Sequence, residues 1–114
     1  MVAKKAQARV TSWTGMASYY SEAGCLGCSP TLTMANGDRL DDSKFTIAML
    51  PETVREYKLL DRIVMVTNES NNKTINALVS DTGGFGKYDR IADLSKATRD
   101  FLECGGLCRV TITL

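Results

Sequence analysis

The sequence contains no histidine, and this absence removes a common route for catalysis. Histidine is the only side chain whose ordinary pKa lets it take up and release a proton near neutral pH. Any proton transfer by this chain near neutral pH must therefore use another group. The same absence removes the nitrogen ligand of mixed zinc sites.

A strong excess of charge and long apolar runs are also missing. The 14 lysines and arginines nearly balance the 13 aspartates and glutamates, which leaves a net charge of +1. A face that binds nucleic acid needs clustered basic residues, so we expect no nucleic-acid partner. No apolar stretch approaches the roughly 18–20 residues of a spanning helix, so we expect no membrane span. The length of 114 residues fits one domain.

The first residues are basic, but no apolar segment follows them. Lys4, Lys5 and Arg9 lie in a polar stretch, which differs from a secretory signal peptide. We predict that residues 1–14 form an N-terminal arm or tail and that residues 15–114 form the folded domain. The arm is the expected contact to other proteins of a larger assembly.

Four cysteines form two short pairs. Cys25 and Cys28 have two residues between them, and Cys104 and Cys108 have three. Such pairs occur in zinc sites and in disulfide-bonded domains. Because the two pairs lie far apart in the sequence and no histidine is present, we predict two disulfides and no metal. The sequence leaves the three pairings open; a bond between the two pairs would tie an early loop to the last strand.

Short segments of apolar and alternating residues predict a mainly β structure. Alternation is typical of strands, and turn signals such as Asn36-Gly37 separate the segments. The number of segments indicates a closed or nearly closed barrel. The expected strands are residues 16–21, 45–50, 63–67, 75–80, 91–94 and 110–114.

One helix is predicted near the C-terminus. Ser95 is a suitable N-cap, and the glycines after residue 104 end the helix. Its expected inner face consists of Ala97, Phe101 and Leu102. Residues 51–58 are charged, which is typical of a surface loop, with a helical turn at most.

Four motifs occur in an order that is typical of one family. Gly15-Met-Ala-Ser-Tyr-Tyr is followed by Thr33-Met-Ala-Asn-Gly-Asp, then by Val79-Ser-Asp-Thr-Gly-Gly-Phe and Arg90-Ile-Ala-Asp-Leu-Ser. The last three resemble the Thr-Ala-Asn-Gly-Glu segment, the Val-x-Asp-Arg-Gly-Pro-Phe loop and the Arg-x-x-Asp-Leu-Ser motif of RlpA-like domains. The first resembles their opening strand, and the match extends over residues 15–114.

The resemblance implies a six-stranded double-psi β-barrel with one or two short helices. Barwin and the first domain of expansins share this fold. The resemblance also implies a groove that receives polysaccharide. Bacterial members are lytic transglycosylases that cleave peptidoglycan, whereas expansins loosen walls without hydrolysis. Peptidoglycan glycan strands are therefore the expected partner, and no cofactor is expected.

Asp81 occupies the position of the family's catalytic aspartate. It follows a predicted strand and enters a loop with Gly83 and Gly84, which let a polymer approach the backbone closely. A carboxyl group in a partly apolar groove can have a raised pKa and donate a proton to a glycosidic oxygen. Asp38 stands where transglycosylases of the family carry a glutamate, and we expect it to assist. The expected aromatic contacts to sugar rings are Tyr20, Phe85 and Tyr88.

Each of these positions also has an ordinary structural interpretation. Asp81 and Asp38 can hydrogen-bond their own turns. Alternation along the first strand directs Tyr19 and Tyr20 to opposite faces, so one of them is expected in the core. Asp93 precedes the predicted helix, where an aspartate commonly satisfies free backbone N–H groups.

Met49 is the main departure from the family. It lies eleven residues after Asp38, where transglycosylases of the family have a histidine, and its thioether carries no titratable proton. Two functions are therefore open. One is cleavage of peptidoglycan with Asp81 as acid/base. The other is a weak or inactive barrel that serves as a structural or wall-attachment module, including one in a bacteriophage particle. Both place the protein in the periplasm, the cell wall or a phage particle.

Overall fold

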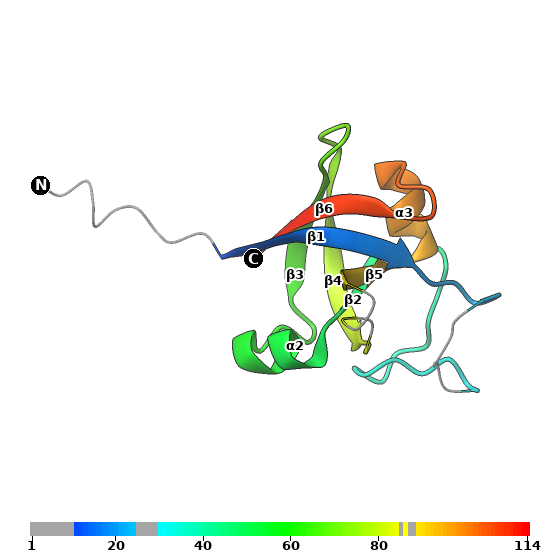
Figure 1. Cartoon of the computed structure of the whole chain (residues 1–114). Coiled ribbons are helices and arrows are strands. Elements are labelled where there is room, and N and C mark those ends of the chain that lie inside the picture. Colours follow the sequence, from blue (N-terminus) through cyan, green and yellow to red (C-terminus); the bar gives the residue numbers. More distant parts are fainter. Residues whose placement is uncertain (1–10, 25–29, 85, 87–88) are drawn as a thin grey trace, which may run out of the picture.

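A computed structural model describes residues 11–24, 30–84, 86 and 89–114 of the chain. The described strands close into a barrel in the order β1–β5–β2–β4–β3–β6 (Figure 1). The closed barrel predicted from the sequence is therefore confirmed. The elements are β1 (Ser12–Tyr19), β2 (Thr46–Met49), α2 (Pro51–Tyr57), β3 (Ile63–Asn68), β4 (Thr74–Thr82), β5 (Arg90–Leu94), α3 (Lys96–Leu102) and β6 (Cys108–Thr113).

The barrel mixes parallel and antiparallel strand pairs. β1 pairs with β5 and β2 pairs with β4 in parallel, while the other four neighbouring pairs are antiparallel. β3 and β4, which follow one another in the sequence, form an antiparallel hairpin. The ends of the described chain also meet, because the N–H of Leu114 donates to the carbonyl oxygen of Thr11 at 3.0 Å.

The core consists of residues that point into the barrel. Val64 and Val66 of β3 alternate with exposed or half-buried neighbours, as do Val110 and Ile112 of β6. Complete burial of a side chain of this size stabilises the fold by about 1.5–3 kcal/mol. The other buried members of this core are Ala17, Ile47, Met49, Val54, Leu59, Ala77, Val79, Ala92, Leu94, Leu102 and Cys108.

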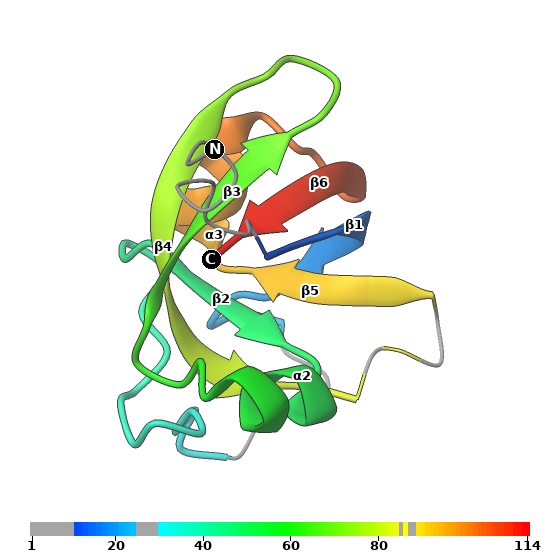
Figure 2. The same ribbon diagram turned by 90° about the vertical axis from the view of Figure 1, so that its left-hand side faces the viewer.

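Residues 51–57 form a complete helix, α2, where the sequence predicted a loop with at most a turn. Pro51 at the helix start has a fixed φ that suits the first turn. The helix ends at Lys58, which has a left-handed φ of 52° and donates its N–H to the carbonyl of Val54. Val54 and Leu59 are buried in the core, and charged residues surround them in the sequence. The helix covers one end of the barrel (Figure 2).

α3 begins as predicted but presents a different inner face. The hydroxyl of Ser95 accepts a hydrogen bond from the N–H of Thr98, which confirms the N-cap. Thr98 and Leu102, four residues apart, are the buried pair. Phe101 was expected to face inward, but 46% of it is exposed. Its ring contacts Phe45 edge to face, with the ring centroids 6.1 Å apart.

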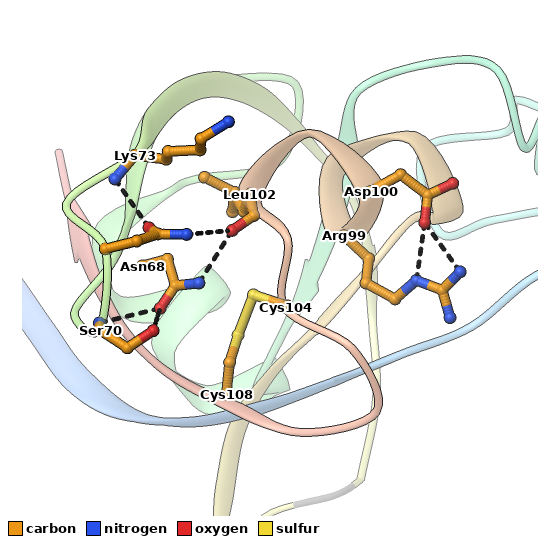
Figure 3. Close-up of a disulfide and its surroundings, with 9 residues drawn as sticks. Asn68, Ser70, Lys73, Arg99, Asp100, Leu102, Cys104 and Cys108 are labelled. Carbon is orange, nitrogen blue, oxygen red and sulfur yellow. Dashed lines mark hydrogen bonds and ion pairs between the residues drawn. A yellow bond between two sulfur atoms is a disulfide. The ribbon is translucent and has the colours of Figure 1, made fainter.

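A disulfide joins Cys104 to Cys108 directly after α3 (Figure 3). This pairing excludes a bond between the two cysteine pairs, so the long cross-link from an early loop to the last strand does not form. Cys25 and Cys28 lie outside the described residues.

A buried amide holds the C-terminal end of α3 (Figure 3). Asn68 is 1% exposed, and its Nδ2 donates to the carbonyl oxygen of Leu102 at 2.8 Å. Its Oδ1 accepts from the N–H of Ser70 at 3.0 Å, and Asn71 donates to the same Leu102 carbonyl at 3.0 Å. The last carbonyl groups of a helix have no partner within the helix, so the β3–β4 hairpin supplies one here.

We expect Asn68→Ala to lower the free energy of unfolding by about 1–3 kcal/mol, because it leaves buried polar groups without partners. Urea denaturation of the oxidised protein measures the loss. Asn76→Ala, at an exposed position of β4, is the control and should change little. Equal losses in the two variants would contradict the assigned role of Asn68.

Candidate functional site

Four residues lie in one row across four neighbouring strands. Ser18 of β1 is opposite Asp93 of β5, Asp93 is opposite Ala48 of β2, and Ala48 is opposite Asp81 of β4. Residues directly opposite one another in a sheet point to the same face. We call this row the carboxylate face. The two aspartates flank the small Ala48, and their backbones are about 10 Å apart at the usual strand spacing.

An irregularity in strand pairing turns Asp81 onto this face. Ile47 pairs with Val79, and both are in the core, but the next residue, Ala48, pairs with Asp81. Ser80 is therefore an extra residue in β4, which is a β-bulge. With regular alternation Asp81 would point inward like Val79. The bulge moves the carboxylate from the core to the outer face.

A second irregularity brings Asp93 beside Ser18. Met16 pairs with Arg90 and Ala17 pairs with Ala92, so Ile91 is the extra residue in β5. The shifted register places Asp93 opposite the next residue of β1, Ser18. The Ser18 hydroxyl donates a hydrogen bond to Oδ1 of Asp93.

The loop at residues 33–39 binds the end of β4 next to Asp81. Oδ1 of Asp81 accepts from the N–H groups of Ala35 and Thr82, each at 2.9 Å. The N–H of Asn36 donates to the carbonyl oxygen of Ser80 at 3.0 Å. These bonds fix the orientation of one oxygen of Asp81. No donor among the described residues contacts its second oxygen.

Asp38 lies on the same loop, at the same end of the barrel as Asp81. Nδ2 of Asn36 donates to Oδ2 of Asp38 at 3.0 Å and to Oδ1 of Asp61 at 2.8 Å. Asp38 and Asp61 therefore lie close together next to the carboxylate face. Asp61 was not expected at the site from the sequence, because the loop after α2 brings it to this position. The turn interpretation of Asp38 also applies, since its N–H donates to Oδ1 of Asn36 at 2.9 Å.

Tyr20 is buried beneath the 33–39 loop and is only 5% exposed. It forms a second apolar cluster with Met34, Leu40 and Ala48. Burial raises the pKa of its phenol to about 12, and the negative charges of Asp81 and Asp93 add to the shift. The expectation that Tyr20 stacks on a sugar ring is therefore not supported by its position, because a buried ring offers no open face.

Tyr19 is the exposed tyrosine of the pair, as strand alternation allows. It is 40% exposed, and the guanidinium of Arg99 lies 3.9 Å from its ring centroid. Of the other expected substrate contacts, Gly83 donates its N–H to the carbonyl oxygen of Met49 at 3.2 Å, and Gly84 is exposed. Phe85 and Tyr88 lie outside the described residues.

The carboxyl group of Asp93 has a pKa above the ordinary value of an aspartate. Burial raises the pKa of its carboxyl group, and the negative charge of Asp81 acts in the same direction. The hydrogen bond from Ser18 and the charge of Arg90 oppose the shift. A carboxyl group with a raised pKa can keep its proton at a pH where an ordinary aspartate has lost it. The N-cap of α3 is Ser95, so Asp93 does not have the helix-start role that the sequence suggested.

Met49 does not lie on the carboxylate face. It is 1% exposed and belongs to the main core, because it is the residue after Ala48 in β2 and points to the opposite face. A histidine placed at residue 49 would therefore enter the barrel interior. Ala48 of β2 and Leu50, which follows the end of that strand, pack next to the site, and neither can carry a proton.

The described residues bring no three metal-ligating side chains together. Neither of the described helices is long and apolar enough to cross a membrane. The chemistry that this part of the chain offers is that of carboxylates and hydroxyls on one outer face of the barrel.

The closed barrel of six strands with two parallel pairs has the double-psi β-barrel fold, and solved structures confirm this. One is the Streptomyces papain inhibitor, with a TM-score of 0.63 and 22% identity over 91% of this chain and 94% of the inhibitor. Another is the Clavibacter michiganensis expansin without ligand, with a TM-score of 0.60 and 19% identity. A mutant of that expansin in complex with cellohexaose has a TM-score of 0.61 and 19% identity.

The chain covers about half the length of the expansin chains, 50% in both structures. Similarity at this level of identity establishes the shared fold. Comparison with protein-family models and with curated proteins finds no match.

We expect the pKa of Asp93 to respond to its two neighbours in opposite directions. Asp81→Asn removes a like charge and should lower the pKa of Asp93, whereas Ser18→Ala removes a hydrogen bond to the carboxylate and should raise it further. Carbon-13 NMR titration of the side-chain carboxyl groups measures both changes. Thr14→Ala, on the same strand, is the control. Shifts of the same sign in both variants would contradict the arrangement.

The same raised pKa has a consequence for stability. The stabilisation linked to the Asp93 proton is present below the ordinary pKa of aspartate, and it is lost as the pH rises through the raised value. We therefore expect Asp93→Asn, which resembles the protonated form, to raise the melting temperature near neutral pH but not in acid. Asp41, whose pKa is lowered by hydrogen bonds from Ser43, gives the comparison. Asp41→Asn should not raise the melting temperature at neutral pH, and an increase in both variants would rule out this explanation.

Proposed function

We propose that this barrel binds glycan strands of a cell wall, with peptidoglycan as the ligand, and that the carboxylate face is the binding surface. The observation that carries the proposal is the position of Asp81 and Asp93 on either side of Ala48. A solved expansin of the same fold is described as a complex with cellohexaose, which supports a glycan as the ligand class. Such a ligand places the protein outside the cytoplasm or in a phage particle.

The two carboxylates are suited to hold sugar hydroxyl groups. Each has one oxygen bonded within the protein, Asp81 to backbone N–H groups and Asp93 to Ser18. The second oxygen of Asp81 can accept from a hydroxyl of the ligand, and that of Asp93 can accept when the group is ionised or donate when it is protonated. Hydrogen bonds to an ionised carboxylate are roughly twice as strong as neutral ones. Asp38 and Asp61 extend this acidic surface along the 33–39 loop.

The same pair can carry out slow cleavage. In a lytic transglycosylase reaction the sugar's own 6-hydroxyl attacks the anomeric carbon, so no water is consumed. We propose that Asp93 gives its proton to the departing glycosidic oxygen and that Asp81 accepts the proton of the attacking hydroxyl. The raised pKa of Asp93 favours the donor role. The chain has no imidazole to relay protons, so binding with weak turnover is the function proposed.

Purified sacculi test the binding. We expect the wild-type protein to co-sediment with them and the double variant Asp81→Asn/Asp93→Asn to bind at least about tenfold more weakly, which corresponds to about 1.4 kcal/mol. Glu52→Gln removes one negative charge from an exposed position of α2 and is the control. If the double variant bound as well as the wild type, the carboxylate face would not be the binding surface.

Released anhydro-muropeptides test the turnover. We expect slow release by the wild type and a loss of about 10²–10⁴-fold in Asp93→Asn, the range of one positioned acid. Chromatography with mass detection measures the products. Rapid release that persisted in Asp93→Asn would contradict the proposed donor. A complete lack of release with binding intact would leave a wall-attachment module.

A second function, inhibition of a cysteine peptidase, is favoured by a different observation. The similarity to the Streptomyces papain inhibitor extends over 91% of this chain and 94% of the inhibitor. The present chain also presents an exposed leucine on a disulfide-closed loop, which is suited to contact another protein. We propose this as an activity separate from the carboxylate face.

A further inference from the structure

We propose that the loop between Cys104 and Cys108 enters the substrate cleft of a papain-like cysteine peptidase, with Leu107 as its central contact. The inference rests on the second proposed function and assigns it to a surface. The loop of residues 104–108 is called the inhibitory loop here, and Tyr19 lies next to it.

The loop is narrow and carries one large side chain. It reads Cys-Gly-Gly-Leu-Cys, and Leu107 is 51% exposed. A Cβ atom added at Gly105 or Gly106 would meet no atom within 4 Å, so space surrounds this backbone. Gly105 has a φ of +70°, a conformation that glycine adopts without strain. A convex, narrow segment with an apolar tip fits a concave cleft better than a flat surface.

The base of the loop is fixed from several directions. The disulfide joins its two ends, and Cys108 pairs with Ala17 in the barrel. The N–H of Cys104 donates to the carbonyl oxygen of Arg99 at 3.1 Å. Asn68 holds the last turn of α3 directly before the loop (Figure 3). A loop already ordered in this way loses little conformational entropy when it binds, which increases affinity.

The backbone of the loop is available to a partner. No described residue provides a backbone acceptor for the N–H groups of Gly105 and Gly106. Peptidase clefts hold their substrates in extended form, through main-chain hydrogen bonds and pockets for side chains, as in other modes of peptide recognition. The two glycines of the loop offer an exposed main chain for hydrogen bonds, and the leucine that follows offers an apolar side chain for a pocket.

A second exposed group lies beside the loop. Ala17–Cys108 is the last residue pair between β1 and β6, so β1 continues to Tyr19 alongside the loop. Arg99 stacks over the Tyr19 ring, and its Nε and Nη2 donate to Oδ1 of Asp100 at 2.9 and 2.7 Å. Tyrosine and arginine are enriched among the residues that dominate binding energy at protein interfaces. Tyr19 and Arg99 therefore extend the contact beyond Leu107.

Inhibition of papain by the complete, oxidised chain tests the inference, with a fluorogenic peptide as the substrate. We expect the wild type to inhibit, and Leu107→Ser to raise the inhibition constant about 10–100-fold, as expected for loss of a buried leucine contact. Tyr19→Ala should weaken inhibition by a smaller factor. Leu60→Ser, at an exposed leucine after α2, is the matched control and should inhibit like the wild type. Binding to sacculi, measured for all variants, shows that the barrel is intact.

The outcomes separate the two levels of the proposal. If the wild type does not inhibit papain, peptidase inhibition is wrong and the loop assignment is overturned with it, while glycan binding is unaffected. If the wild type inhibits and Leu107→Ser inhibits equally well, the activity stands and the loop assignment alone is wrong. If papain cuts the loop and inhibition disappears, the loop is a substrate and the assignment is again overturned. Inhibition that depends on Leu107 and not on Leu60 supports the assignment of the activity to the inhibitory loop.

Discussion

The single extra residue in β4 controls the outer face of this barrel. Because Ser80 is inserted into the pairing with β2, Val79 stays in the core and Asp81 points outward. The carbonyl oxygen of Ser80 also receives the N–H of Asn36, which attaches the 33–39 loop. That loop in turn orients Asp81 and covers Tyr20. One change of register thus determines the direction of a carboxylate, the position of a loop and the burial of an aromatic ring.

Burial of the Asp93 carboxyl group at this site costs free energy of folding, which the rest of the fold must offset. Asp93 is held in surroundings that disfavour its charge, and Asp81 adds like-charge repulsion. The closed barrel offsets this cost, since a large and continuous apolar core fills its interior. For this reason, a protein with a proton-transfer site is commonly less stable than the same protein with neutral side chains at that site.

The sequence predicted most elements that depend on local pattern and failed where tertiary contacts decide. Alternation located the strands, and the hydroxyl of Ser95 identified the start of α3. The charged residues of segment 51–58 concealed α2, because only Val54 of that helix is buried. Phe101 has the spacing of an inner residue, but Phe45 provides it with a partner on the surface.

The site was harder to predict than the barrel, and the reason is physical. The motif resemblance identified Asp81, but it could not show which face each neighbour occupies. A β-bulge cannot be recognised from the alternation of apolar and polar residues in a sequence. The facing position of Asp93 was therefore not predicted, and the residue was interpreted as a helix-start residue. Counting residues from Asp38 likewise led to Met49, while the residue of β2 between the two aspartates is Ala48.

The hydrogen bond between Thr11 and Leu114 has a consequence for protein engineering. The points where the chain enters β1 and leaves β6 are close enough to be joined by a short linker, and new ends can then be opened in a surface loop without loss of the barrel order. The same geometry allows the whole barrel to be inserted into a loop of another protein, since its entry and exit occupy almost the same point. A circularly permuted version opened at the tip of the β3–β4 hairpin would keep every strand pair of the closed sheet.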